Sequence, residues 1–312
     1  MTIAFVGQIP DDEMAGWVDR LSVLLPNENV VPFANLTDED KAEAELAIVA
    51  NPDPAEIAAL PKLKWIHSVW AGVERMMAEL KEVEVPIVRL TDPELSRTMA
   101  EAVLAWTYYL HRDMPHYQKA QTAKQWSPAE YFKPSQKRVT VLGLGALGNA
   151  SAQKLKEAGF QVSGWSRRPK VIDGVDCYGG DEGLKEVLRR TDYLVVLLPL
   201  TPETKGLLNK EILSLLPKGA GLINFARGPI IVDADLRDLL DNGHLSHAVL
   251  DVFDVEPLPE DSSYWAHPSV TVLPHISAPT DTDTASQIVA GNIQTYRENG
   301  EIPPAVSRKE GY

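Results

Sequence analysis

The sequence predicts an α/β protein with two domains, each built on a parallel sheet. Short apolar runs alternate with polar stretches of helical periodicity along most of the chain, which is typical of βαβ units. In addition, a G-x-G-x-x-G segment, residues 143–148, follows one apolar run directly and opens a helical stretch. This context is typical of a doubly wound Rossmann domain that binds a dinucleotide.

The first part of the chain carries the strands of the smaller domain. Four apolar runs are expected to be strands, at residues 2–7, 44–50, 63–70 and 87–90. The stretches between them have helical periodicity, which makes this a βαβ series with a parallel sheet. From Asp92-Pro93 a long helical region runs to about residue 123. We expect this helix to bridge the two domains.

A second βαβ series follows a loop at residues 127–137. Its expected strands are at residues 138–145, 161–166, 193–200, 221–226, 247–253 and 270–273. The final helix, from about Asp283 to Asn299, is amphipathic and follows the last strand, so we expect it to return to the first domain. The sequence therefore predicts a flavodoxin-like substrate domain of residues 1–98 plus 283–312, into which a Rossmann domain of residues 99–282 is inserted.

Composition and charge narrow the class of protein. The 312 residues are 44% hydrophobic and 24% charged, as in an ordinary globular protein with room for two domains. The net charge of −14 argues against nucleic acid or an anionic membrane as a partner. The chain opens on a strand rather than a secretory signal, and Cys177, its single cysteine, cannot form an internal disulfide. We therefore expect a cytoplasmic protein.

The glycine-rich segment has the residues that a pyrophosphate site needs. Gly143 allows a tight turn, Gly145 lets a pyrophosphate approach the backbone, and Gly148 lets the helix pack closely on the strand. Ala146 and Leu147 lie at the start of the helix, where free N–H groups and the helix dipole favour an anion. The alternative is a glycine-rich turn with no ligand.

The end of the next strand indicates which dinucleotide binds. An acidic residue that hydrogen-bonds the ribose 2′-hydroxyl is expected roughly 20 residues after the loop, but this chain has Ser166 there, followed by Arg167 and Arg168. Two guanidinium groups suit a 2′-phosphate. The sequence therefore predicts NADP(H) in preference to NAD(H), the alternative being that the arginines belong to a solvated turn.

Three polar residues follow three of the expected strands at or just beyond their carboxyl ends. They are Arg227, Glu256 and His275. Ligands bind at this edge of an open parallel sheet, so the three side chains are expected to share one crevice. A guanidinium can anchor a 2-oxo acid, an imidazole can donate a proton and a carboxylate can tune the imidazole. Singly, each residue has an ordinary structural explanation: a surface salt bridge, a solvated turn and a capped or core histidine.

Together these segments resemble the D-isomer-specific 2-hydroxyacid dehydrogenases. The resemblance covers nearly the whole chain and is carried, in order, by WAGVE, TMAEAV, VLGLGALG, LLPLTPETKGLLN, NFARGPIIVDADL, AVLDVFDVEPLP and HPSVTVLPHIS. It implies an NADPH-dependent reductase of small 2-oxo acids, with glyoxylate and hydroxypyruvate as the best candidates. In that family the arginine at Arg227 binds the substrate carboxylate and carbonyl oxygen, the histidine at His275 protonates that oxygen as hydride arrives, and the carboxylate at Glu256 charges and orients the imidazole.

The same resemblance implies further contacts. Backbone N–H groups of the loop at Ala71, Gly72 and Val73 are expected to hold the substrate carboxylate. Asp251 is expected to face the nicotinamide carboxamide. The remaining expected cofactor contacts are Leu198, Pro199, Thr204 and Ala226. The resemblance also implies a homodimer, and no cluster of Cys, His and carboxylate residues at metal-ligand spacing is present, so no metal is expected.

Two alternatives remain at this point. A larger 2-oxo acid such as phenylpyruvate would use the same chemistry, because sequence does not give the size of the pocket. A different class is a dinucleotide-sensing scaffold protein, which could keep the same residues and show negligible turnover.

Overall fold

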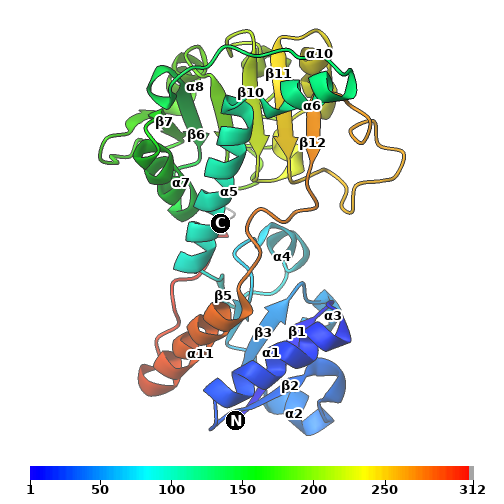
Figure 1. Cartoon of the computed structure of the whole chain (residues 1–312). Helices are drawn as coiled ribbons and strands as arrows, with labels where there is room; N and C mark the ends of the chain where they lie inside the picture. Colours follow the sequence, from blue (N-terminus) through cyan, green and yellow to red (C-terminus); the bar gives the residue numbers. More distant parts are fainter. Residues whose placement is uncertain (309–312) are drawn as a thin grey trace. The chain divides into compact units, whose positions relative to one another are not determined.

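The computed structural model describes residues 1–308, in which the chain forms two compact units (Figure 1). Unit 1 comprises residues 1–94 and the described residues from Thr280 onward, and unit 2 comprises Leu95–Pro279. These boundaries lie four and three residues before the ones expected at 98/99 and 282/283. Residues 309–312 of the expected first domain lie outside the described residues.

Unit 1 contains a five-stranded parallel sheet with the order β2-β1-β3-β4-β5. Its strands are β1 (Thr2–Gly7), β2 (Asn29–Pro32), β3 (Leu46–Ala50), β4 (Trp65–Ser68) and β5 (Ile87–Val88). This 2-1-3-4-5 order is that of flavodoxin-like sheets, as expected. The edge strand β2 was not among the expected strands.

Helices cover both faces of the unit 1 sheet. Helices α1 (Asp11–Leu24) and α11 (Thr282–Asn299) pack side by side on one face, and α3 (Pro54–Ala58) and α4 (Glu74–Glu79) contribute to the core on the other (Figure 1). A short turn, η1 (Phe33–Asn35), and α2 (Asp38–Glu43) connect β2 to β3. All five residues of β3 are buried, as is usual for a parallel strand covered on both faces.

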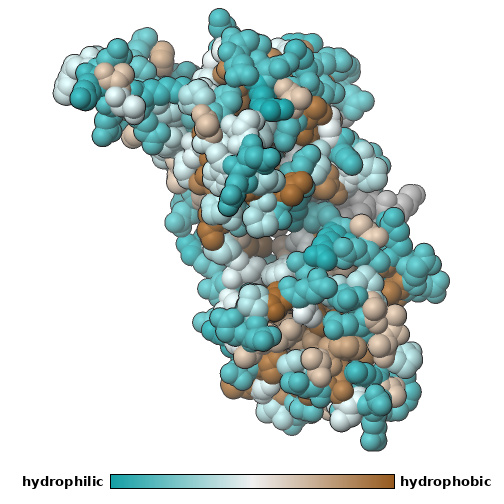
Figure 2. All heavy atoms as spheres, turned by 90° about the vertical axis from the view of Figure 1, so that its right-hand side faces the viewer, coloured by the Kyte–Doolittle hydropathy of each residue, from teal (hydrophilic) through white to brown (hydrophobic). Residues whose placement is uncertain are grey.

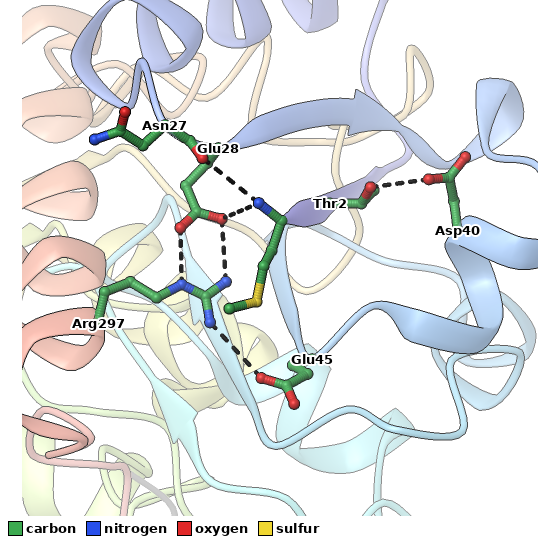
Figure 3. A network of polar contacts seen from close by, with 7 residues as sticks. Thr2, Asn27, Glu28, Asp40, Glu45 and Arg297 are labelled. Atoms are coloured by element: carbon green, nitrogen blue, oxygen red, sulfur yellow. Dashed lines mark hydrogen bonds and ion pairs between the residues drawn. The ribbon is translucent and has the colours of Figure 1, made fainter.

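A polar network fastens α11 to the amino-terminal segment of unit 1 (Figure 3). Arg297 donates from Nε and Nη2 to the two carboxylate oxygens of Glu28, at 2.9 and 3.1 Å. The amino group of Met1 lies 3.4 Å from Glu28 Oε2, and Arg297 Nη1 lies 3.7 Å from Glu45 Oε2. Segments from both ends of the described chain therefore share one ion-pair network, which explains why α11 belongs to unit 1.

Unit 2 contains a seven-stranded parallel sheet with the order β12-β11-β10-β9-β6-β7-β8. Its strands are β6 (Arg138–Leu142), β7 (Gln161–Ser166), β8 (Asp176–Gly179), β9 (Tyr193–Val196), β10 (Ala220–Asn224), β11 (Leu245–Leu250) and β12 (Val270–Val272). The strand order reverses between β6 and β9, which defines a doubly wound Rossmann sheet with a switch point at that place. The expected fold class is confirmed.

Helices cover both faces of this sheet as well. Helices α5 (Pro93–His111) and α7 (Ala146–Glu157) contribute to the core on one face. The other face is covered by α8 (Gly180–Leu188), α9 (Lys210–Leu213) and α10 (Asp233–Asp241). Two short 3₁₀ turns, η2 (Pro134–Gln136) and η3 (Gly228–Ile230), precede β6 and follow β10.

The expectation of one continuous helix from residue 93 to about 123 was wrong. Helix α5 ends at His111, and a separate helix, α6 (Met114–Thr122), begins after Asp113. Asp113 has a left-handed backbone with φ of 52°. Pro115 explains the break, because proline lacks an N–H donor and its ring clashes with the preceding turn of a continuous helix.

The surface of both units is mixed in character. In the view of Figure 2, hydrophilic side chains are spread over each unit and smaller groups of hydrophobic side chains lie between them. Among the helices of residues 1–308, none combines the length and apolar character that a membrane crossing requires.

Candidate active site

Three neighbouring strands of unit 2 bring the polar trio to one edge of the sheet. Strands β10, β11 and β12 pair side by side and run parallel (Figure 1). Arg227 lies three residues after the end of β10, and His275 lies three residues after the end of β12. Glu256 lies in the segment that follows β11. The carboxyl-edge rule therefore places all three where ligands of such sheets bind.

His275 and Glu256 form a direct pair. The Nδ1 atom of His275 lies 2.7 Å from Oε2 of Glu256. The other oxygen of Glu256 accepts a hydrogen bond of 2.9 Å from the backbone N–H of Phe253, which fixes the orientation of the carboxylate. The His275 side chain is 51% exposed, and Nε2 is the ring nitrogen that Glu256 does not engage.

The pair keeps the imidazole charged to higher pH than usual. The hydrogen bond with Glu256 is the main cause that raises the pKa of His275, and the charges of Glu256 and Asp251 add to it, against burial and the charge of Arg227. Partial burial raises the pKa of Glu256, but the hydrogen bonds from His275 and Phe253 outweigh it and the net pKa is lowered. Both directions favour the ion pair. An imidazole in this setting can act as a general acid near neutral pH.

The backbone at His275 is held in an unusual conformation by Asp251. His275 has a left-handed φ of 53°, which is uncommon for a residue other than glycine. Its N–H donates to the carbonyl oxygen of Asp251 at 3.0 Å. The buried carboxylate of Asp251 accepts hydrogen bonds from the N–H groups of Ile276 and Ser277, at 2.8 and 3.0 Å. Asp251, expected to face the nicotinamide, thus also holds the turn that carries the imidazole.

Two residues that the sequence did not single out position Arg227. The side chain of Asn224 accepts from the N–H of Ala226 at 3.1 Å and donates to the carbonyl of Arg227 at 3.2 Å. Arg227 itself donates from Nη1 to the carbonyl of Ala226 at 2.7 Å. A Cβ atom on Gly228 would overlap the Phe253 carbonyl carbon, so only glycine allows this close approach. The segment that contains Arg227 and Gly228 therefore packs closely against the segment that leads from Phe253 to Glu256.

The glycine-rich loop is shaped as a dinucleotide requires. Gly143 has a φ of 99°, and a Cβ atom there would lie 2.5 Å from the carbonyl oxygen of Leu197. A Cβ atom on Gly148 would overlap the carbonyl oxygen of Gly143. Gly145, by contrast, has no atom within 4 Å of its Cβ direction. The packing of the protein explains the first and third glycines, whereas the open space at the second fits the approach of a pyrophosphate.

The turn after β7 carries the cations expected to select the cofactor. The hydroxyl of Ser166 donates to the carbonyl oxygen of Arg168 at 2.6 Å, and this hydrogen bond stabilises the turn. The side chains of Arg167 and Arg168 are exposed. Because α7 starts at Ala146, next to the loop, its first N–H groups and these guanidinium groups together form a donor set that fits a phosphorylated dinucleotide.

The other expected cofactor residues also lie in unit 2. Some of their side chains make hydrogen bonds within their own loop or are buried in the core. The hydroxyl of Thr204 donates to the carbonyl of Pro199 at 2.7 Å and accepts from the N–H of Thr201 at 2.8 Å, so it stabilises its own loop. The side chains of Leu198 and Ala226 are buried in the core. Any contact that these two make with a cofactor would therefore come from their backbone.

The expected substrate loop belongs to unit 1. Ala71 and Gly72 follow β4, and Val73 immediately precedes α4. The N–H of Trp70 is held by the hydroxyl of Ser68 at 3.1 Å, which shapes the entry to the loop. Because the trio belongs to unit 2, a joint role of this loop and the trio in substrate binding stays a prediction.

Three of the remaining histidines are hydrogen-bonded to residues of their own unit. The ring of His67 bonds to the Ser68 carbonyl and to Asn292, His247 bonds to Thr271, and His267 bonds to Asp241. Within residues 1–308, no group of three or more His, Cys, Asp or Glu side chains could hold a metal ion.

A family model and a curated relative match most of this chain. The model of the D-isomer specific 2-hydroxyacid dehydrogenase NAD binding domain matches residues 104–277. Glyoxylate/hydroxypyruvate reductase A of Yersinia enterocolitica is 36% identical over 309 residues, which cover 97% of this chain and 98% of the relative.

Two solved structures are similar over the full length. A D-isomer specific 2-hydroxyacid dehydrogenase of Xanthobacter autotrophicus Py2, in complex with NADPH and MES, has a TM-score of 0.93 and 37% identity, with 100% of this chain and 99% of that chain covered. An NADPH-dependent glyoxylate/hydroxypyruvate reductase of Sinorhizobium meliloti, in complex with NADP and sulfate, has a TM-score of 0.92 and 31% identity, with the same coverage.

Proposed function

This chain belongs to the D-isomer specific 2-hydroxyacid dehydrogenase family, and on that premise we propose that it uses NADPH to reduce glyoxylate to glycolate and hydroxypyruvate to glycerate. The single observation that carries the proposal is the 2.7 Å pair of His275 and Glu256, at the sheet edge that also carries Arg227. The names of the relatives supply the substrate class. The dinucleotide loop of the same unit supplies the site for the cofactor.

His275 is the proton donor in this proposal. Because Nδ1 is engaged by Glu256, Nε2 is the ring atom that gives its proton to the carbonyl oxygen of the substrate. Glu256 keeps the ring oriented and charged before the proton moves, and it stabilises the charged ring when the proton returns from solvent.

Arg227 is the anchor. Its planar guanidinium binds the substrate carboxylate and the carbonyl oxygen, and it stabilises the negative charge that develops on that oxygen. The overall conversion consumes one proton, which His275 delivers, and yields the 2-hydroxy acid and NADP⁺.

The cofactor is held by residues of unit 2. The N–H groups of Gly145, Ala146 and Leu147 receive the pyrophosphate, and Arg167 and Arg168 receive the 2′-phosphate. Asp251 holds the turn of Ile276 and Ser277, and through this turn it lines the nicotinamide end of the cofactor site. When bound, NADPH supplies the hydride that reduces the carbonyl carbon.

The test compares initial rates of NADPH and NADH oxidation with glyoxylate, hydroxypyruvate, pyruvate and phenylpyruvate. We expect turnover of NADPH with the two named small acids to exceed all other combinations. Turnover with phenylpyruvate alone would overturn the substrate class, and turnover with NADH alone would overturn the cofactor preference. Tight dinucleotide binding without turnover of any acid would instead indicate a scaffold protein.

We further propose that the protein is a homodimer that works in the cytoplasm. Residues 112–137, here called the arm, contain five basic and two acidic residues in a chain of net charge −14, so the arm complements the surface of a second copy. The arm also exposes apolar side chains, with Trp126 at 99% and Tyr131 at 60% exposure. The cytoplasm fits a chain in which Cys177 is the only cysteine.

The oligomer is tested by the molar mass in solution. We expect a dimer for the wild type and a shift toward monomer for Trp126→Glu. Val23→Glu is the control, because Val23 lies on α1 outside the arm and is 80% exposed. A monomeric wild type would contradict the dimer, and an unchanged mass of Trp126→Glu would contradict the arm as its interface.

A further inference from the structure

His67 is a buried histidine of unit 1 that the proposed mechanism does not use. It lies on β4, one residue before the end of that strand, and is fully buried. Its Nδ1 atom lies 2.9 Å from the carbonyl oxygen of Ser68, and its Nε2 atom lies 2.9 Å from the amide nitrogen of Asn292 on α11. The ring therefore joins α11 to the carboxyl end of β4.

The two partners define the protonation state of the ring. A carbonyl oxygen can only accept, so Nδ1 carries the proton, and an amide nitrogen can only donate, so Nε2 is the acceptor. Burial lowers the pKa of His67 to about 4, although the bond to the Ser68 carbonyl raises it. At neutral pH the ring is therefore an uncharged group whose donor is directed at Ser68.

Ser68 connects this ring to the loop of residues 71–73. Its hydroxyl accepts from the N–H of Trp70 at 3.1 Å, and the carbonyl of Trp70 accepts from the N–H of Leu90 at 3.1 Å. Ser68 is fully buried, so its carbonyl would find no water in place of the donor from His67. The bonds of Ser68 thus hold the residue from which the loop starts.

The loop itself offers unengaged donors. Within residues 1–308, the N–H groups of Ala71, Gly72 and Val73 donate to no backbone or side-chain acceptor. The far end of the loop is also held, because the carbonyl of Val73 accepts from the N–H of Met77 at 2.8 Å. A short loop that is fixed at both ends and has successive unengaged N–H groups suits a carboxylate.

We propose that His67 is a positioning residue for substrate binding: through Ser68 it holds the N–H groups of residues 71–73 in place for the carboxylate of the 2-oxo acid. This inference rests on the proposed function and on the expected role of the loop. His67 does not touch the substrate. Its Nδ1–H group holds the Ser68 carbonyl, and Asn292 keeps the proton on that nitrogen. Substrate affinity therefore depends on the bond to Ser68 rather than on the bulk of the ring.

Two variants separate the two ring nitrogens. His67→Asn places an amide N–H near the position of Nδ1 and loses the acceptor for Asn292, whereas His67→Gln reaches the position of Nε2 and loses the donor to Ser68. The test measures kcat and KM for glyoxylate and hydroxypyruvate at saturating NADPH, together with the dissociation constant of NADPH.

We expect His67→Gln to raise both KM values about tenfold, as the loss of roughly one charge-assisted hydrogen bond to the carboxylate implies. The kcat values and the dissociation constant of NADPH should stay within about twofold of the wild type, because the lost contact is one of substrate binding. His67→Asn keeps the bond to Ser68, so its KM values should stay within about threefold of the wild type.

The matched control is His247→Gln. His247 is a buried histidine of unit 2 that bonds to Thr271 at 2.9 Å, and burial lowers its pKa to about 4 as well. This variant should lower Tm, since it disturbs a buried polar contact, and should leave both KM values within about twofold of the wild type. A fall in Tm by itself is thus separated from a change in substrate affinity.

Ser68→Ala tests the next bond along the same path. It removes only the hydroxyl oxygen that accepts from Trp70, and this small change keeps the inference testable even if His67→Gln does not fold. Both KM values should rise about threefold or more, the effect of one neutral hydrogen bond. Unchanged KM values in Ser68→Ala would overturn the inference.

The remaining outcomes are distinct. An equal rise of KM in His67→Asn and His67→Gln would assign His67 to packing alone and overturn the inference. Unchanged KM values in His67→Gln, with wild-type reduction of both acids intact, would also overturn it and leave the proposed function standing. A loss of NADPH affinity that parallels the rise in KM would mean general damage and would overturn it too. A wild type that reduces neither acid would contradict the proposed function, and the inference would fall with it.

Discussion

Glu256 lies 2.7 Å from His275 although 19 residues separate them in sequence. The carboxylate cannot turn away from the ring, because its second oxygen is bonded to the N–H of Phe253 at 2.9 Å. The hydrogen bonds to Asp251 hold the backbone of residues 275–277, which fixes the point from which the imidazole extends. The pair is thus set before substrate arrives, which is the condition for an efficient proton donor.

Replacing Glu256 by Gln should shift the pH dependence of reduction to lower pH. The pKa of His275 is raised mainly by its hydrogen bond with Glu256, so the pKa should fall when the negative charge is removed. In the proposed mechanism, reduction needs protonated His275 and is lost as pH rises through that pKa. The loss should therefore begin at lower pH in the variant, as measured by kcat against pH. Glu260→Gln in the same exposed loop is the control, and an unmoved profile in Glu256→Gln would count against the pairing.

The double variant Ser166→Asp with Arg167→Ala should shift cofactor preference toward NADH. The new carboxylate can accept from the ribose hydroxyls and repels a 2′-phosphate, and one guanidinium is removed. The ratio of kcat/KM for NADPH to that for NADH should fall by about tenfold or more, the effect of roughly one charged contact. If the ratio is unchanged, the turn after β7 does not select the cofactor.

Gly228→Ala should damage both stability and activity. The added Cβ atom overlaps the Phe253 carbonyl carbon, which forces apart the segments that carry Arg227 and Glu256. We expect a loss of about 1–3 kcal/mol in the free energy of unfolding of unit 2, as for other overpacked sites, together with a lower kcat. Hydrogen exchange of the β10 and β11 peptides measures the first and initial rates the second.

Gly291→Ala is the matched control for that variant. Gly291 lies within α11 and has no atom within 4 Å of its Cβ direction, so alanine should be tolerated or should stabilise the helix by about 0.5–1 kcal/mol. Normal activity and exchange in Gly228→Ala would show that the close approach to Phe253 is not required.

Arg297→Ala should loosen α11 from unit 1. Arg297 and Glu28 are only 19% and 10% exposed, and the variant leaves Glu28 with the amino group of Met1 as its remaining charged partner (Figure 3). We expect protection from hydrogen exchange in the α11 peptides to fall by about 2–3 kcal/mol, as for a partly buried charged pair.

The exposed pair of Arg20 and Asp283 provides the comparison. These side chains are 44% and 73% exposed, so Arg20→Ala should cost less than about 1 kcal/mol. Equal effects of the two variants would mean that the network of Glu28 does not fasten the helix.

The sequence alone predicted the features that depend on residues close together in the chain. The spacing of Gly143, Gly145 and Gly148 predicts a tight turn, open space for a pyrophosphate and close packing of the helix on the strand. The structure has all three features. The strand runs of unit 2 predicted a shared carboxyl edge, because parallel strands end on the same side. That edge brings His275 and Glu256 to the same side of the sheet, and their pairing was expected from the family resemblance.

Features that depend on contacts distant in sequence were missed. The bond of Lys170 to Leu144 and the contact of Gly228 with Phe253 join segments that no local pattern relates, although a glycine directly after Arg227 was a possible signal. Strand β2 has only four residues and ends in Pro32, so its pattern was too short to stand out. The break at Asp113 could have been inferred from Pro115, whose effect on the helix is local.

The most direct test of the central claim is a paired measurement on His275→Gln: the rate of glyoxylate reduction at saturating NADPH, and the dissociation constant of NADPH. Glutamine keeps a polar side chain of similar reach but cannot deliver a proton as an imidazolium does. The account predicts that kcat falls by about 10²–10⁴-fold, the usual contribution of a general acid. The dissociation constant of NADPH should stay within about twofold of the wild type, because the proposed pyrophosphate and 2′-phosphate contacts lie elsewhere in unit 2. Turnover close to that of the wild type would contradict the assignment of His275 as the proton donor.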